Sequence, residues 1–198
     1  MQQDQITGYS EKLQIEKRYV TVTTKETLLE MVEAIEEASR ISLDTETTSL
    51  NPRKGKIIGF SITTKIGTGF YLPTLKWNNY TQKLEELLIE GKSTHNIAVR
   101  VMKMLKGKKL ICHNASFDLR YIKNYYGVSL IEDLWVDTAL LVHTVQEEGA
   151  GMGVFGLKPL AVSIQEHIGL NVEEAANKEQ VELKESIKKN GGSTTKDS

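Results

Sequence analysis

The sequence predicts an α/β domain in which helices cover a mixed β-sheet. Three observations support this prediction: an amphipathic pattern over residues 25–40, three successive strand patterns between residues 41 and 74, and a later alternation of helix and strand patterns. In such sheets, functional sites gather where strands end and helices begin. Polar residues at those junctions are therefore the first candidates for function.

The first two elements are a short strand and a helix. Residues 18–24 (RYVTVTT) are rich in β-branched side chains, which favour a strand. Residues 25–40 place their apolar side chains on one stripe with helical spacing. Thr24 is a typical residue for the start of such a helix.

An antiparallel meander of three strands is expected next, over residues 41–48, 56–64 and 67–74. Each of these segments is bounded by Gly, Pro or Asn, which are common in the short loops of hairpins. The pattern then turns helical from residue 81 to residue 107.

The remaining elements alternate between strand and helix. The expected segments are an apolar strand over 108–114, a helix over 115–126 ended by Gly127, and helices over 136–145 and 156–170 joined by a glycine-rich loop. The prediction is therefore a mixed five-stranded sheet with flanking helices.

Composition fits one globular domain, with 39% hydrophobic and 26% charged residues in a chain of 198. We expect an N-terminal extension over residues 1–17, a domain over 18–190 and a flexible tail over 191–198. There is no apolar run of membrane-spanning length and no signal-peptide pattern, so a cytoplasmic protein without membrane contact is expected. Cys112 is the only cysteine, which excludes a disulfide framework and a thiolate metal site.

Two carboxylates stand two positions apart at the end of the second predicted strand. Side chains alternate along a strand, so Asp44 and Glu46 share one face. A third, Asp118, is expected in the first turn of the helix that follows residues 108–114. Either these acids lie at a solvated strand end and a helix start, or they gather around Mg²⁺ or Mn²⁺, which prefer oxygen ligands.

Two motifs carry a resemblance to a known family. The segments "DTETTSL" (44–50) and "HNASFD" (113–118) resemble the first two motifs of the DEDD 3′–5′ exonucleases, which have the RNase H-like fold. From about residue 18 to about residue 170, the order of segments is more similar to the proofreading domain of family A (Pol I-like) DNA polymerases. The "GFYLPT" segment favours that domain over the RNase D-type relatives.

The resemblance implies a catalytic centre with two divalent ions, Mg²⁺ or Mn²⁺. Asp44 would bridge both ions, Glu46 would bind one of them, and Asp118 would hold the second, partly through water. Such a pair of ions stabilises the attacking and leaving oxygens of an in-line displacement at phosphorus.

The resemblance also implies contacts with the 3′-terminal nucleotide of DNA. Thr47 and Asn114 match positions that steady this nucleotide, and Leu50 matches an apolar residue that wedges against its base. Phe117 would support stacking, or it belongs to the core. The basic clusters 53–56 and 100–109 either lie along a DNA path or are solvated faces.

The third motif of the family, a Tyr or His followed closely by an Asp, has no match. The last tyrosine is Tyr126, and the only aspartate after Asp137 is Asp197 in the tail. Asp137 matches a family position that is not a metal ligand, and we expect it to cap a helix. The chain is thus expected to stop before the last catalytic helix, to bind metal weakly and to cleave DNA slowly on its own.

The leading hypothesis is a proofreading 3′–5′ exonuclease domain that acts on a single-stranded 3′ end of DNA. A polymerase domain in the same or a companion chain is the expected partner. One alternative is a non-catalytic module that binds DNA or braces a polymerase domain, and another is an RNA-processing exonuclease of the RNase D type. Three minor expectations concern single residues: Trp77 and Trp135 are core anchors, and Cys112 is a small buried residue.

Overall fold

The structure is a computed structural model that describes residues 18–145 and residues 156, 157 and 160. The elements described below lie within one compact unit, residues 15–146. In chain order they are β1 (Arg18–Thr21), α1 (Lys25–Glu37), β2 (Arg40–Thr47), β3 (Ile57–Thr63), β4 (Thr68–Pro73), β5 (Leu75–Asn78), β6 (Lys83–Glu86), β7 (Leu88–Ile89), β8 (Lys92–Ser93), α2 (Thr94–Met104), β9 (Lys109–Cys112), α3 (Ala115–Tyr126), a 3₁₀ turn (Ile131–Asp133), β10 (Leu134–Asp137) and α4 (Thr138–Val145).

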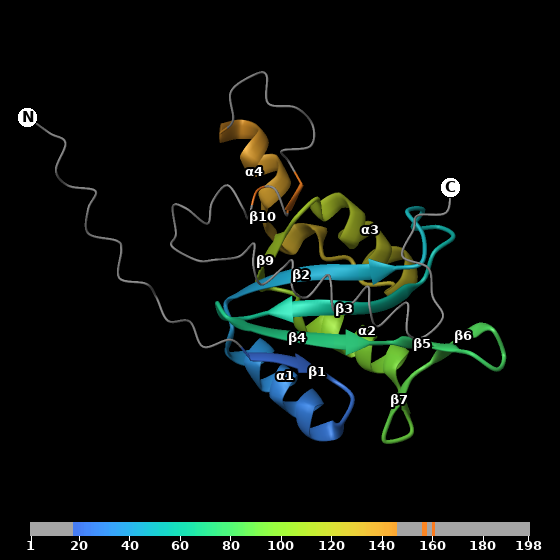
Figure 1. Ribbon diagram of the computed structural model, residues 1–198. Coiled ribbons are helices and arrows are strands. Elements are labelled where there is room, and N and C mark those ends of the chain that lie inside the picture. Colours follow the sequence, from blue (N-terminus) through green and yellow to red (C-terminus); the bar gives the residue numbers. More distant parts are fainter. Residues whose placement is uncertain (1–17, 146–155, 158–159, 161–198) are drawn as a thin grey trace, which may run out of the picture. The chain divides into compact units, whose positions relative to one another are not determined.

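The main sheet is mixed, as predicted, with the strand order β1-β4-β3-β2-β9-β10 (Figure 1). Antiparallel pairing of β2 with β3 and of β3 with β4 confirms the expected meander. The pairs β1–β4, β2–β9 and β9–β10 are parallel. Because β9 extends the sheet beside β2, the loop after β9 reaches the strand that carries the two acidic residues.

The prediction of five strands was wrong, because residues 18–145 already contribute six strands to the sheet. The strand that was missed is β10, which pairs with β9 with a shift in register between Leu134 and Val136. Val136 and Asp137 had been assigned to the following helix, which instead begins at Thr138. A four-residue strand followed directly by a helix is too short to show the alternation of apolar and polar residues that identifies a strand in a sequence.

The helical prediction for residues 81–91 was also wrong. The segment contains β6 and β7, and Trp77 and Lys76 of β5 pair across the hairpin with Leu84 and Glu85 of β6. Gln82 and Glu90 have left-handed backbone angles, with φ of 52° and 48°. A right-handed helix cannot pass through such residues, and only the following segment forms a helix, α2.

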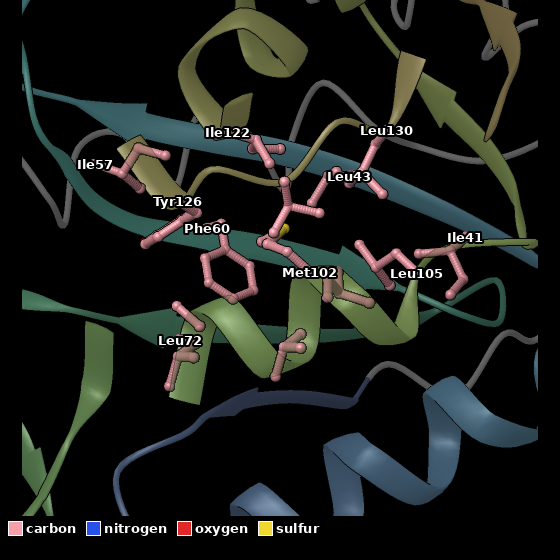
Figure 2. Packing of buried hydrophobic residues seen from close by; sticks show 14 of the residues in the cluster. Ile41, Leu43, Ile57, Phe60, Leu72, Met102, Leu105, Ile122, Tyr126 and Leu130 are labelled. Atoms are coloured by element: carbon pink, nitrogen blue, oxygen red, sulfur yellow. The ribbon is translucent and has the colours of Figure 1, made fainter. Parts of the chain in front are cut away.

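The core lies between one face of the sheet and the helices, as the labelled side chains in Figure 2 show. Its largest members that are fully buried include Phe60 of β3, Met102 of α2 and Tyr121 of α3. Cys112 is buried, as predicted. The prediction that both tryptophans anchor the core was wrong, since Trp77 is 55% exposed and Trp135 is 49% exposed.

The predicted helix boundaries are confirmed at two places. Thr24 caps α1: its hydroxyl accepts a hydrogen bond from the Thr27 amide, and its own amide donates to the Thr27 hydroxyl. Gly127 ends α3 with φ of 69°, a left-handed angle that favours glycine. The predicted N-terminal extension, the glycine-rich loop and the tail lie outside the described residues, as does the 156–170 helix except at Gly156, Leu157 and Leu160.

No helix in the part of the chain that the structure describes has both the length and the apolar character needed to cross a bilayer.

Candidate active site

Strand β2 places its acidic residues on one face of the sheet. Ile41, Leu43 and Thr45 are buried, and the residues between them are exposed on the opposite face. Asp44 and Glu46 therefore point to the same side, as the alternation in the sequence predicted. Their carboxylates lie close enough for the charge of Glu46 to act on Asp44.

Asp118 joins this strand from the first turn of α3. Its side chain is only 2% exposed, and its Oδ1 atom accepts hydrogen bonds from the Thr45 amide (2.9 Å) and the Thr45 hydroxyl (2.6 Å). The register between β2 and β9 ends at Ser42 and Ile111, before Thr45 is reached. Strand β9 therefore offers no acceptor to the buried Thr45 amide, and Asp118 supplies the acceptor instead.

Burial and neighbouring carboxylates raise the pKa of two acids of the site, Asp44 and Asp118. Burial and then the charge of Glu46 raise the pKa of Asp44, while His113 lowers it. Burial raises the pKa of Asp118, the hydrogen bond from the Thr45 hydroxyl lowers it, and the charge of Asp44 raises it again. A carboxylate whose pKa is raised by a neighbouring carboxylate is stabilised in its ionised form when a cation binds between the two.

The chemistry of these side chains fits a hard divalent cation. All three offer carboxylate oxygens, which Mg²⁺ and Mn²⁺ prefer. Burial raises the pKa of the nearby Cys112 thiol to about 12, so the thiol is protonated at neutral pH. Among the described residues, however, no three or more His, Cys, Asp or Glu side chains are already arranged to hold a metal.

Asp137 caps α4, as expected, and it also holds the start of α3, which was not expected. Its carboxylate accepts hydrogen bonds from the amides of Asn114 (3.0 Å) and Ala115 (2.8 Å), and from Ala139 at the start of α4. Asn114 is exposed and adopts a left-handed backbone conformation with φ of 60°. This cap fixes the junction from which Asp118 projects.

Tyr121 of α3 connects the two predicted motifs, a role that the sequence did not reveal. Its hydroxyl donates to the backbone carbonyls of Ser49 and Asn51, which belong to the loop after β2. Leu50 lies between these residues and is 88% exposed. The Tyr121 ring also packs on Phe117, with ring centroids 5.1 Å apart. Phe117 is half-buried against the core, so its ring supports the loop anchor.

Thr47 lies at the start of the same loop. It is half-buried, and its hydroxyl donates to the Ser49 carbonyl at 3.0 Å. The structure therefore brings Thr47, Leu50 and Phe117 together through the loop that Tyr121 holds. Asn114 precedes the first turn of α3 and lies about two helical turns before Tyr121.

The change Tyr121→Phe should lower the free energy of unfolding by about 1 kcal/mol, because it removes one hydrogen-bonding group from a buried position. Amide hydrogen exchange in residues 48–51 should become faster, since the loop loses its anchor. Tyr125→Phe, on the same helix but half-buried, is the control. Equal exchange rates in the two variants would contradict the anchoring role.

Tyr71 of β4 is a second residue that the sequence did not single out. Its ring crosses Gly59, where an added Cβ atom would lie 2.5 Å from Tyr71 Cζ. Gly59 is the register partner of Glu46. Burial and then the charge of Glu46 raise the pKa of Tyr71, so a neutral phenol borders the acidic face. No local sequence signal marks this contact, because it depends on the pairing of three strands.

Comparison with known proteins identifies the family. The 3′–5′ exonuclease family matches residues 19–189 of the chain. DNA polymerase I of Borreliella burgdorferi is 33% identical over 110 residues, which are 54% of this chain and 11% of the relative. The chain thus spans only a small part of the length of that polymerase.

Two solved structures share the fold. The Pol1 POL domain of M. smegmatis, in complex with DNA primer-template and dNTP, has a TM-score of 0.52 and 18% identity, over 75% of this chain and 23% of that one. Escherichia coli RNase D, an exoribonuclease involved in structured RNA processing, has a TM-score of 0.50 and 18% identity, over 79% and 35%. The RNase H-like fold is confirmed, and the chain belongs to the 3′–5′ exonuclease family found in Pol I-like DNA polymerases.

Proposed function

We propose that this chain carries the acidic part of a proofreading centre that removes the 3′-terminal nucleotide of DNA. The contact between Asp118 and Thr45 is the observation that supports this proposal most directly. It ties a buried carboxylate to the strand segment whose neighbouring residues are Asp44 and Glu46. The charge of Asp44 also raises the pKa of Asp118, which supports a common site for acids from two distant segments.

The proposed roles follow the two motifs. Asp44 would bridge two Mg²⁺ or Mn²⁺ ions, with Glu46 on one and Asp118 on the other. These ions would lower the pKa of the attacking water and neutralise the leaving 3′ oxygen. Thr45 orients Asp118 through two hydrogen bonds. The exposed Leu50 would contact the terminal base, and Thr47, Asn114 and Phe117 would position the nucleotide.

The proposed substrate is a frayed single-stranded 3′ end of DNA, and the proposed partner is a polymerase domain in the same or a companion polypeptide. The match to a DNA polymerase I supports both. We also propose that the centre needs a third motif, because no Tyr or His after Tyr126 in the printed sequence is followed closely by an Asp. Loss of one member of a catalytic unit typically removes orders of magnitude of rate. The 198-residue chain alone is therefore expected to cleave slowly.

Binding of Mn²⁺, measured by electron paramagnetic resonance, tests the metal site. Asp44→Asn/Glu46→Gln should weaken binding by at least about 10-fold, the loss that even an outer-sphere change typically causes. Glu33→Gln/Glu37→Gln removes two exposed carboxylates of α1 and is the matched control for charge. If both double variants bind Mn²⁺ as the unchanged chain does, the site is placed wrongly.

Cleavage of 5′-labelled strands tests the reaction and its substrate. A single-stranded DNA should shorten from its 3′ end in the presence of Mg²⁺, faster than an RNA of the same sequence. Asp118→Asn should stop this shortening. Equal shortening of RNA would favour the RNase D-type alternative, and rates typical of complete family members would show that the third motif is not missing.

The non-catalytic module is the second candidate, and one observation favours it. The described residues contain no ready cluster of three metal-binding side chains. This candidate predicts that DNA binds with or without Mg²⁺ and that Asp44→Asn leaves DNA affinity unchanged. If DNA is shortened from its 3′ end by the unchanged chain but not by Asp44→Asn, the non-catalytic candidate is excluded.

A further inference from the structure

The loop after β2 and the exposed face of α3 carry basic side chains that the site above does not use. Arg53 and Lys54 lie in the turn of this loop, and Arg120 and Lys123 lie on α3. All four side chains are exposed, and together they are called the loop–α3 surface below. Because the net charge of the chain is −1, a polyanion can be attracted only by a local group of cations such as this one.

Hydrogen bonds hold the turn of this loop against α3. The Tyr121 hydroxyl donates to the Asn51 carbonyl (3.1 Å), and the Asn124 amide group donates to the Pro52 carbonyl (3.5 Å). Gly55, at the end of the turn, has no room for a Cβ atom, because the Tyr121 hydroxyl occupies that place. The turn therefore lies directly beside α3 (Figure 1).

The backbone of the turn is ordered by one residue, Asn51. Its Oδ1 atom accepts a hydrogen bond from the Arg53 amide (3.0 Å), and its carbonyl accepts from the amides of Lys54 (3.0 Å) and Gly55 (2.9 Å). Basic side chains on an ordered turn lose less conformational entropy when they bind a partner than side chains on a flexible loop.

The basic residues of α3 lie on the face of the helix that adjoins this turn. Arg120, Lys123 and Asn124 are three and four positions apart, so they are neighbours on the helix surface. Asn124 contacts Pro52 in the turn. The cations of the helix and those of the loop therefore belong to one continuous surface.

The loop–α3 surface contains no carboxylate of its own. Residues 48–56 include no Asp or Glu, and the only acid of α3 is Asp118, which is buried. Glu86 acts by its charge on Tyr125, which helical spacing places on the side of α3 away from Arg120 and Lys123. Within the part of the chain that the structure describes, none of the four basic side chains forms an ion pair or a hydrogen bond.

We propose that the loop–α3 surface binds the phosphates of a single-stranded DNA whose 3′ end lies at the acidic site. Leu50, the proposed contact of the terminal base, belongs to the same loop as Arg53 and Lys54, so a strand that reaches Leu50 passes close to these cations. Basic side chains that contact phosphates position a strand without reading its sequence. The inference rests on the proposed function, because it assumes that the strand ends at Asp44 and Glu46.

The test measures the affinity of the 198-residue chain for labelled oligo(dT) by fluorescence anisotropy in EDTA at several salt concentrations. For single strands, the logarithm of the binding constant falls with the logarithm of the salt concentration by about 0.7 for each phosphate contact. Arg53→Gln/Lys54→Gln and Arg120→Gln/Lys123→Gln should each lower this slope by about 1.4, and the four-fold variant by about 2.8. A change of 1.4 is about a 25-fold loss of affinity at 0.1 M salt relative to 1 M salt.

Lys103→Gln/Lys106→Gln is the matched control for the loss of two positive charges. Both lysines are exposed at the C-terminal end of α2, within the second basic cluster of the sequence, residues 100–109. The salt dependence of this variant should equal that of the unchanged chain. Because every replaced side chain is exposed, all variants should keep the circular dichroism spectrum of the unchanged chain.

Three results would overturn the proposal: an unchanged slope in the four-fold variant, an equal change in Lys103→Gln/Lys106→Gln, or no binding of the unchanged chain. If the four-fold variant loses affinity for an oligoglutamate peptide but not for oligo(dT), the surface binds an acidic protein segment and not DNA.

The assay in EDTA needs neither a metal nor cleavage, so it can fail independently of the proposed reaction. If Mn²⁺ binding depends on Asp44 and Glu46 but oligo(dT) binding does not depend on the loop–α3 surface, the exonuclease proposal stands and the surface proposal fails. The opposite pair of results would reject the metal site and keep the surface as a DNA contact.

Discussion

Asp44→Asn should abolish the stabilisation of the chain by Mn²⁺. An ion that binds only the folded state adds about 2.7 kcal/mol of stability at a free concentration of 100 times its Kd. Asp44 is the proposed bridging ligand, and its carboxylate lies on the same face as Glu46. The unchanged chain should therefore unfold at a higher temperature in Mn²⁺ than in EDTA, and Asp44→Asn should show almost no difference.

In EDTA the same variant should be more stable than the unchanged chain at neutral pH. Burial and the charge of Glu46 raise the pKa of Asp44 in the folded state. The folded state then holds more protons than the unfolded state, so this group lowers stability as pH rises through its titration range. The advantage of Asp44→Asn should vanish in acid, where Asp44 is protonated in both states.

Thermal unfolding followed by circular dichroism, at several pH values and with either EDTA or Mn²⁺, measures both effects. Glu33→Gln, on the exposed face of α1, controls for the loss of one negative charge. An equal Mn²⁺ shift in the unchanged chain and in Asp44→Asn would rule out Asp44 as a ligand. Proteins often become more stable when a charged group that serves function is removed from an active site.

Thr45→Val should lower the free energy of unfolding by about 1.5–3 kcal/mol at neutral pH, the range for a hydrogen bond to a charged group. Valine has the shape of threonine but cannot donate to the Asp118 carboxylate, which accepts from the Thr45 hydroxyl at 2.6 Å. Asp118 would keep only the Thr45 amide as a donor from this residue. Its buried charge would then be poorly compensated.

The loss in Thr45→Val should become smaller as pH falls. The Thr45 hydrogen bond lowers the pKa of Asp118 against the effect of burial, so its removal raises that pKa further. Once Asp118 is protonated, the missing donor matters less. Urea denaturation at neutral and at acid pH measures the difference, with Thr63→Val on the half-buried part of β3 as the control. A loss that does not depend on pH would contradict the role of the charge.

Strand alternation and turn residues predicted the part of the fold that positions the acids. The apolar, polar, apolar order of β2 correctly placed Asp44 and Glu46 on one face, and the meander followed from its short loops. The catalytic roles of these acids stay predictions. Their shared face could be inferred because it depends only on local spacing.

Features that depend on distant pairing could not be predicted. The segment 81–91 has helical spacing, yet cross-strand pairing with β5 and the left-handed Gln82 make it a hairpin. Trp77 and Trp135 were expected in the core because they flank apolar segments, but both lie on short strands that leave them exposed. The contact of Thr45 with Asp118 joins residues 73 positions apart, which no local pattern can show.

That same contact sets the order in which the site can form during synthesis. Asp44 and Glu46 leave the ribosome 73 positions or so ahead of the helix that brings Asp118 to Thr45. A nascent chain that has made only β2 to β4 lacks the third acid and the acceptor for the buried Thr45 amide. If the three acids bind metal as proposed, that binding has to wait until β9 and α3 have docked, so the site cannot form before this part of the fold.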